Sequence, residues 1–227
     1  MIFKPDFSKA YSKANDILVF SKIISKFPYS TKKLIGEQPN ITCKSYNQAH
    51  LYNVDIEAFG SESAVAIQNE DGKTIIFYNQ DETRERIRFS TLHEDGHIVL
   101  DHNLENKDKD VYDIYEIEAN YFAAQLLMPE QILREFQRRG KRITKQFLIE
   151  NFDVSESAAQ KRLDTLVKTT WERNELETRF DDIILKKYLT WIDSVVPRRI
   201  EDFYLDEEER QAERERWWNG RYLRGGD

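Results

Sequence analysis

Hydrophobic residues recur at helical spacing over several long stretches of the chain. Residues 8–27 place their apolar side chains on one face and stop at Pro28, which predicts an N-terminal helix. The same period predicts one helix over residues 83–101 and another over residues 111–127. Pro129 follows directly and suits the first position of a further helix. The pattern therefore predicts a chain built mainly of helices.

Two short apolar runs interrupt the helical pattern. Residues 64–68 and 74–78 are typical of strands, and the turn-forming sequence Asn-Glu-Asp-Gly lies between them at 69–72. We therefore expect a hairpin, followed by the helix over residues 83–101. This predicts an α+β fold in which a small, mostly antiparallel sheet packs against that helix and a mainly helical C-terminal part follows.

The C-terminal part changes character along its length. The pattern predicts one helix over residues 129–139 and two short helices within residues 144–167. The last sixty or so residues keep a helical pattern but become rich in charge, which is typical of solvated helices. We expect three parts, with boundaries at 1–140, 141–170 and 171–227.

Composition and charge narrow the possible classes of protein. The chain of 227 residues is 33% charged but also 12% aromatic, and the aromatic share argues against wholesale disorder. A net charge of −7 disfavours a protein that mainly binds nucleic acid or an anionic membrane without specificity. Cys43 is the only cysteine, which excludes an intramolecular disulfide and a cysteine-based zinc finger and suits the reducing cytosol.

The sequence has no segment typical of targeting or of a membrane span. Residues 1–10 lack the apolar stretch that a signal peptide needs. No run approaches the ~18 consecutive apolar residues of a membrane-spanning helix. We therefore expect a soluble, cytoplasmic protein.

One predicted helix carries an H-E-x-x-H motif, as His93-Glu94-Asp95-Gly96-His97. Two histidines four residues apart lie on the same face of a helix, so both imidazoles can reach one Zn²⁺ ion. Glu94 is then placed to act as general base on a water bound to the metal. The motif therefore predicts a hydrolase, most often of peptide bonds. The alternative interpretation of the motif is a solvated helix whose two histidines have this spacing by chance.

A catalytic zinc usually has three protein ligands and one open position, so the motif leaves one ligand to be found. His50 lies far upstream, in a stretch without regular pattern. His102 lies about one and a half turns beyond His97, where a continued helix would point it away from the shared face. A third histidine six residues beyond the motif is absent, because that position is Asn103.

Carboxylates on the following helix are better candidates for the third ligand. Glu116 and Glu118 are two residues apart, hence about 200° apart around a helix, so they cannot both face one metal ion. Asn120 lies four residues after Glu116 on the same face, where its amide could hydrogen-bond a ligating histidine. We therefore prefer Glu116 and leave Glu118 open as the alternative.

Three blocks of sequence surround and follow the motif. They are a strand ending in asparagine at 75–79 (IIFYN), the motif helix at 86–97 (RIRFSTLHEDGH) and a block at 116–129 (EIEANYFAAQLLMP). Together they resemble the ImmA/IrrE family of metallopeptidases, over about residues 64–135. Residues 148–167 are similar to the small helix-turn-helix-like module that often follows the peptidase core of that family.

The resemblance implies a cytosolic protein of a bacterium, phage or mobile element that cleaves a cognate helix-turn-helix repressor. It implies that His93, His97 and Glu116 bind Zn²⁺ and that Glu94 is the catalytic base. The three expected parts then become a zinc metallopeptidase core, a helix-turn-helix-like module and an extension that resembles nothing in the family. Asp95 stands where the family more often has an apolar residue, but it points off the zinc face, so we expect activity to be retained.

Two other functions stay open. A zinc-dependent regulator could bind its partner without cutting it, in which case Glu94→Gln would leave function intact. A helix-turn-helix protein with a vestigial metal site would bind DNA, in a salt-dependent way, after metal removal. Residues 144–167 include Lys161 and Arg162 but also acidic residues that offset them, so we favour docking of a protein partner over DNA.

Overall fold

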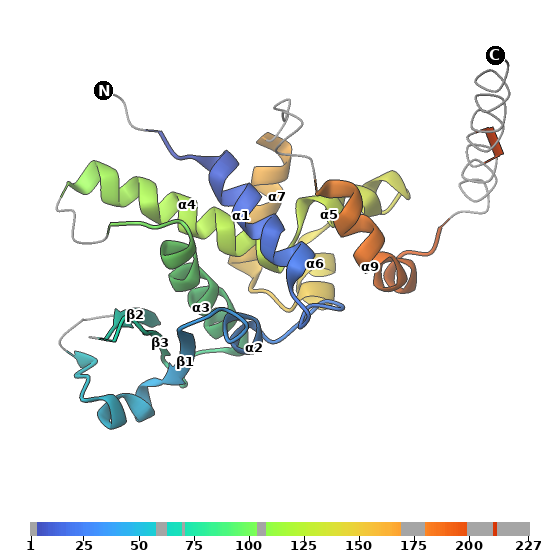
Figure 1. Cartoon of the computed structure of the whole chain (residues 1–227). Coiled ribbons are helices and arrows are strands. Elements are labelled where there is room, and N and C mark those ends of the chain that lie inside the picture. The colour runs from blue at the N-terminus through green and yellow to red at the C-terminus, as the bar shows by residue number, and fades with distance from the viewer. Residues whose placement is uncertain are drawn as a thin grey trace, which may run out of the picture.

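The computed structural model of the chain describes residues 4–57, 63–69, 71–103, 108–168, 180–198 and 211–212. A small sheet lies at one end of this part of the chain and a larger body of helices at the other (Figure 1). None of the described helices is long and apolar enough to cross a membrane. The elements are α1 Phe7–Phe20, α2 Thr31–Ile35, β1 Ile41–Ser45, the 3-10 helix η1 Tyr46–Tyr52, β2 Ala64–Gln68, β3 Thr74–Tyr78, α3 Arg84–Val99, α4 Lys109–Leu127, α5 Glu130–Arg138, α6 Lys145–Phe152, α7 Glu156–Lys168 and α9 Asp181–Val195.

The sheet contains the predicted hairpin and one further strand. β2 pairs antiparallel with β3, with Ala66 opposite Ile76. The turn between them ends at Gly72, whose φ of 75° lies in the left-handed region that favours glycine. β1 joins the other side of β3 in parallel, with Cys43 opposite Ile76, so the strand order is β1-β3-β2 and the sheet is mixed. The α+β class is confirmed, and β2 is an edge strand.

α3 lies between the sheet and the other helices. One side of α3 packs on α2, β2 and β3, the other side packs on α4, and α1 runs along α4 (Figure 1). Leu92 of α3 and Phe122 and Leu126 of α4 are fully buried in the core that these helices share. The motif helix is therefore held on both sides by packing.

The two motif-bearing helices approach each other closely at Gly96. A Cβ atom there would lie 3.0 Å from Cδ1 of Phe122 and 3.2 Å from Cα of Ala119. Distances this short would force the neighbouring atoms to move, and the Ala119 backbone cannot move as a flexible side chain can. Ala119 and Glu116 are three residues apart and share a face of α4. The contact at Gly96 therefore also determines how near Glu116 comes to α3.

The later helices are fixed to this body by buried polar contacts. Asp153, at the turn between α6 and α7, accepts a hydrogen bond of 2.6 Å from the buried Arg88 of α3 and pairs with the exposed Arg84 at 2.9 Å. α9 is attached to the end of α1, where Lys187 Nζ donates to the carbonyl oxygen of Leu18 at 2.7 Å. Both contacts satisfy groups that would be costly to bury alone.

The division into three parts, with boundaries at 140 and 170, stays a prediction. The buried face of α9 belongs to the same core cluster as α1 and α4. Of the charged extension expected from the sequence, residues 171–179, 199–210 and 213–227 lie outside the described residues.

We expect Gly96→Ala to destabilise the protein although alanine favours the helix more than glycine does. The gain in helix propensity is about 1 kcal/mol, whereas forcing a methyl group into a packed interface costs roughly 1–3 kcal/mol. We expect a net loss of up to about 2 kcal/mol in the free energy of unfolding, measured by denaturant titration.

Gly36→Ala is the matched control for this experiment. Gly36 has a φ of −67°, and the nearest atoms to an added Cβ lie 3.4 and 3.5 Å away, which is ordinary contact. This variant should be as stable as the wild type or slightly more stable. Equal stabilities of Gly96→Ala and Gly36→Ala would contradict the close approach of α3 and α4.

Candidate metal centre

α3 presents both motif histidines on one face. The helix begins after Thr83, whose side chain accepts a hydrogen bond from the N–H of Arg86, and it continues through the motif to Val99. The Nε2 atoms of His93 and His97 lie 3.1 Å apart. The structure therefore brings both imidazoles to one point.

Glu116 of α4 joins this pair, whereas Glu118 does not. The Glu116 carboxylate lies 3.4 Å from Nε2 of His93 and 3.3 Å from Nε2 of His97. The three candidate ligand atoms lie within 4.8 Å of one another. A tetrahedral ion with bonds of about 2.0–2.1 Å places its ligands about 3.4 Å apart, so the donor set and its spacing suit Zn²⁺.

The charges of these groups shift their pKa values. A hydrogen bond from His93 holds the pKa of Glu116 well below its usual range. Burial lowers the pKa of His93, but the hydrogen bond and the negative charge of Glu116 outweigh it, so the net pKa of His93 is raised. The side chain of Asn120 adds to this rise. The cluster therefore attracts positive charge to the point on which its donor atoms converge.

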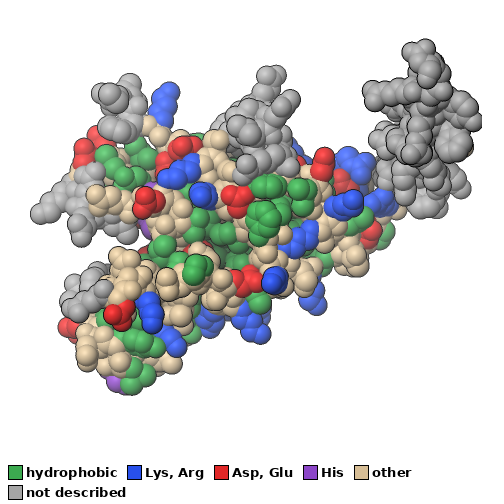
Figure 2. Space-filling model, viewed as in Figure 1, with side chains coloured by type: hydrophobic (Ala, Val, Ile, Leu, Met, Phe, Trp, Pro, Cys, Tyr) green, Lys and Arg blue, Asp and Glu red, His purple; other side chains and the backbone are tan. Residues whose placement is uncertain are grey.

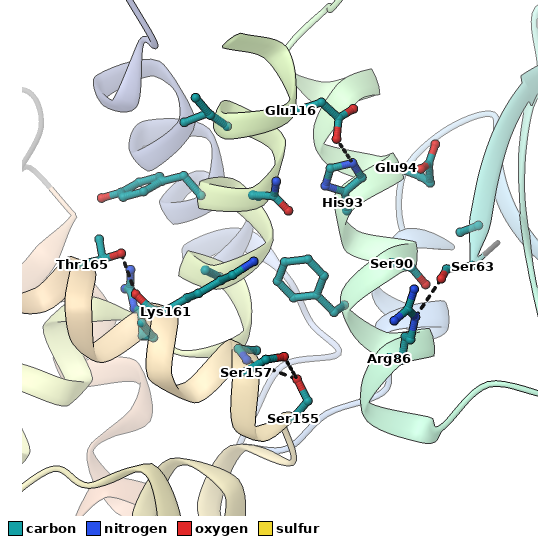
Figure 3. A pocket seen from close by; sticks show the side chains of 18 of the residues that line it. Ser63, Arg86, Ser90, His93, Glu94, Glu116, Ser155, Ser157, Lys161 and Thr165 are labelled. Atoms are coloured by element: carbon teal, nitrogen blue, oxygen red, sulfur yellow. Dashed lines mark hydrogen bonds and ion pairs between the residues drawn. The ribbon is translucent and has the colours of Figure 1, made fainter. Parts of the chain in front are cut away.

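Glu94 lies beside the cluster but is oriented by the sheet. Its Oε2 atom accepts a hydrogen bond of 3.1 Å from the N–H of Ala66 in the edge strand β2. Burial raises the pKa of the Glu94 carboxyl, although the neighbouring histidines act in the opposite direction. Figure 3 shows Glu94, His93 and Glu116 together at one end of a cleft. The motif predicted the place of Glu94, but the contact with Ala66 depends on how the sheet packs on α3.

His102 lies off the metal-facing side, as the sequence predicted, but it contacts the back of His97, which the sequence did not predict. α3 ends at Val99, and Asp101, with a φ of 57°, turns the chain back, so His102 does not follow the helical spacing. Its Nδ1 atom lies 3.0 Å from Nδ1 of His97, and its Nε2 atom lies 2.9 Å from Oε2 of Glu118. Burial lowers the pKa of His102, which favours the neutral imidazole. His102 therefore lies behind His97, on the side away from the converging donor atoms.

His50 and Tyr112 differ in how they lie relative to the cluster. His50 is exposed in η1 and does not belong to the cluster. Tyr112 of α4 lines the cleft, and burial together with the nearby charge of Glu116 raises the pKa of its hydroxyl group.

Asp95 points to the opposite side of α3 and is fully buried. The Nε2 atom of Gln38 donates to its two carboxylate oxygens at 2.7 and 2.9 Å. Burial raises the pKa of Asp95 to about 7. The motif helix therefore carries a carboxylate whose negative charge is costly at neutral pH.

The cluster opens into a cleft of about 1450 Å³. α3 and α4 line one side through Phe89, His93 and Glu116, and α7 lines the other side through Lys161 and Lys168. Figure 2 shows the molecule hollowed between the part that carries the sheet and the body of helices. In Figure 3, Lys161 lies across the cleft from His93. The cluster is thus reachable from solvent and faces a wall made by a different helix.

A hydrolase that uses a metal ion needs converging ligands, a carboxylate beside them and an open approach, and this chain combines all three in an α+β fold. These features define the class as metallopeptidase-like. A comparison with protein families matches residues 48–164, slightly more than half of the chain, to the IrrE N-terminal-like domain. The chain belongs to this peptidase family, which confirms the resemblance seen in the three sequence blocks. A comparison with curated proteins found no match.

We expect Asp95→Asn to stabilise the protein at neutral pH. The ordinary pKa of 3.8 rises to about 7 on folding, so the folded state binds this proton more tightly than the unfolded state does. Wild-type stability should therefore fall as the pH rises from about 4 to about 7, while the variant lacks this contribution. The variant should gain about 1–3 kcal/mol at about pH 8 and less at about pH 5, measured by denaturant titration.

Asp164→Asn, at an exposed position of α7, controls for the change of side chain itself. Its stability relative to the wild type should not vary between the two pH values. If the stability of Asp95→Asn depended on pH in the same way as that of the wild type, the raised pKa of Asp95 would be contradicted.

Proposed function

We propose that the chain is a zinc-dependent endopeptidase that hydrolyses a peptide bond in a cognate protein in the cytoplasm. The proposed substrate is a helix-turn-helix transcriptional repressor of a phage or mobile element. The observation that carries the proposal is the convergence of His93, His97 and Glu116 on one point, with Glu94 beside them, in an open cleft. Membership of a peptidase family supports the same type of reaction.

His93, His97 and Glu116 are the residues that would hold the ion. Two imidazoles and one carboxylate suit zinc, and three protein ligands leave one position open. When bound, Zn²⁺ supplies a Lewis acid that lowers the pKa of water toward about 7 and polarises a carbonyl group. The raised pKa of His93 means that ion binding is in competition with a proton.

Glu94 is the group that moves protons in the proposed reaction. Its carboxylate takes a proton from the attacking water and then gives it to the amine nitrogen that leaves as the peptide bond breaks. Burial raises its pKa, which brings the group closer to the pH at which it has to accept and release a proton. The N–H of Ala66 binds Oε2, which leaves Oε1 as the oxygen that takes this proton in the proposed reaction.

The cleft suits a polypeptide better than a small metabolite. Its volume of about 1450 Å³ exceeds the ~300–1,000 Å³ of common small-molecule sites. α7, from the segment similar to a helix-turn-helix module, places Lys161 and Lys168 along one wall. Two lysines there favour a polar or acidic segment of a protein partner. The net charge of −7 argues against DNA as that partner.

Metal content and cleavage together test the proposed function. We expect one zinc ion per wild-type chain by mass spectrometry, none in Glu116→Ala, and one in Glu94→Gln. Glu94→Gln keeps the three proposed ligands but cannot accept a proton. It should therefore lower kcat by about 10²–10⁴-fold toward a repressor that the wild type cleaves, found in a panel of phage and mobile-element repressors.

The alternative functions lead to different results in the same experiments. If the protein is a regulator that binds its partner without cutting it, the Glu94→Gln variant should relieve repression as well as the wild type does. If the protein binds DNA and its metal site is vestigial, the wild type should contain no zinc and should still bind DNA in the presence of a chelator. Either result would replace the peptidase proposal.

Charge reversal on α7 tests whether this helix helps to bind the substrate. In a Glu94→Gln background, which prevents cleavage, Lys161→Glu should weaken repressor binding about fivefold, because an attractive charge becomes repulsive. Lys186→Glu makes the same change at an exposed position of α9 that does not line the cleft. Isothermal titration calorimetry should detect the loss only in the first variant. An equal loss in both variants, or in neither, would remove α7 from the docking surface.

A further inference from the structure

A buried chain of hydrogen bonds runs from the metal-facing cluster to the start of α1. Nδ1 of His97 lies 3.0 Å from Nδ1 of His102, and Nε2 of His102 lies 2.9 Å from Oε2 of Glu118. The other oxygen of Glu118 accepts a hydrogen bond of 2.6 Å from the N–H of Asp6. The side chains of His97, His102 and Glu118 are only 4%, 1% and 7% exposed, so solvent does not interrupt the chain.

The donor and acceptor at each link follow from elementary chemistry. An ionised carboxylate only accepts hydrogen bonds, so Glu118 requires a proton on Nε2 of His102. A neutral imidazole carries one proton, which leaves Nδ1 of His102 as an acceptor. The facing Nδ1 of His97 must then be the donor. A neutral His97 therefore carries its proton on Nδ1 and keeps a lone pair on Nε2. The hydrogen bond that the Glu116 carboxylate accepts then comes from Nε2 of His93, 3.4 Å away.

We propose that Glu118 and His102 are positioning residues that fix the tautomer of His97, so that its Nε2 lone pair faces the metal position before the ion binds. The inference rests on the proposed role of His97 as a zinc ligand. Glu118 does not belong to the metal-facing cluster, and the proposal gives it a role. Glu118 does not contact His97 directly but acts on it through His102.

The surrounding contacts hold His102 in the orientation that this role requires. The ring of Tyr115 stacks on the His102 ring, with centroids 4.3 Å apart and an angle of 11° between the planes. Lys9 of α1 donates to the carbonyl oxygen of Leu100, at the point where α3 ends. The side chain of Asp6 caps the start of α1, so the N–H of Asp6 approaches Glu118 from a fixed direction. The N-terminal helix thus supports the far end of the chain of hydrogen bonds.

Glu118→Gln is the most direct test because it changes one oxygen to an NH₂ group and little else. Two donors surround Glu118, and a glutamine oxygen can accept from only one of them. The N–H of Asp6 cannot lose its proton, so the glutamine NH₂ group should face Nε2 of His102. The proton of His102 then moves to Nδ1, and His97 has to carry its own proton on Nε2, at the metal position.

Nitrogen NMR of the metal-free protein reads these tautomers without reference to activity. The chain has four histidines, and the exposed His50 serves as an internal control. Above neutral pH we expect the Nδ1–H form of His97 in the wild type and the Nε2–H form in Glu118→Gln. An Nε2–H form of His97 in the wild type, or the same form in both proteins, would overturn the proposal.

Zinc affinity, measured by competition with a chromophoric chelator, gives a second readout. We expect Glu118→Gln to bind zinc about 10–100-fold more weakly than the wild type. In His102→Gln the amide can still reach Glu118 but offers no acceptor to His97, so a similar loss is expected. In His102→Asn the amide oxygen can replace Nδ1 as the acceptor, so the loss should stay below about fivefold.

Equal losses in His102→Asn and His102→Gln would show that the acceptor facing His97 is unimportant and would overturn the proposal. Thermal unfolding of each variant separates this effect from a general loss of structure. A wild-type protein that binds no zinc would refute the proposed function, whereas the tautomers of the metal-free protein would still decide whether Glu118 and His102 act on His97.

Discussion

The close approach of α3 and α4 at Gly96 is the physical constraint on which the rest of the structure depends. A side chain at this position would meet Phe122 and the backbone of Ala119. Because there is none, α4 lies near enough for Glu116, one turn before Ala119, to reach the two histidines of α3. A wider gap would leave the carboxylate out of reach while the hydrophobic core still formed. The glycine of the motif therefore links the packing of two helices to the chemistry that they support.

α3 buries polar side chains on several faces, which is unusual for a helix at the centre of a core. Arg88, Asp95 and His97 are each at most 5% exposed. Burial of such groups is unfavourable unless each has a partner, and the partners come from distant parts of the chain. Gln38 binds Asp95, and Asp153 binds Arg88. These contacts make the orientation of α3 specific, because a rotation of the helix would separate several buried groups from their partners at once.

The features that could be predicted from the sequence are those that depend on local periodicity. Helical spacing placed the two motif histidines on one face and showed that only one of Glu116 and Glu118 could face them, and the structure places Glu116 there. The hairpin was predictable for the same reason. The return of His102 toward α3 was not, because it depends on a left-handed conformation at Asp101 that no local pattern indicates. The parallel pairing of β1 and the contact from Ala66 to Glu94 depend on segments that meet only in the folded chain.

Backbone groups of the fold orient the carboxylates around the cluster. Two of the carboxylates are fixed by backbone N–H groups, which cannot rotate away: Asp6 donates to Glu118 and Ala66 donates to Glu94. The hydrophobic core that supports these segments extends from α1 to α9 and contains none of the metal-facing side chains. In small zinc domains the metal supplies much of the folding free energy, because no such core exists without it. Here the donor atoms already lie at distances that suit an ion. The packing of α3, α4 and the sheet therefore contributes to the orientation of the donor atoms, as a site held on rigid elements requires.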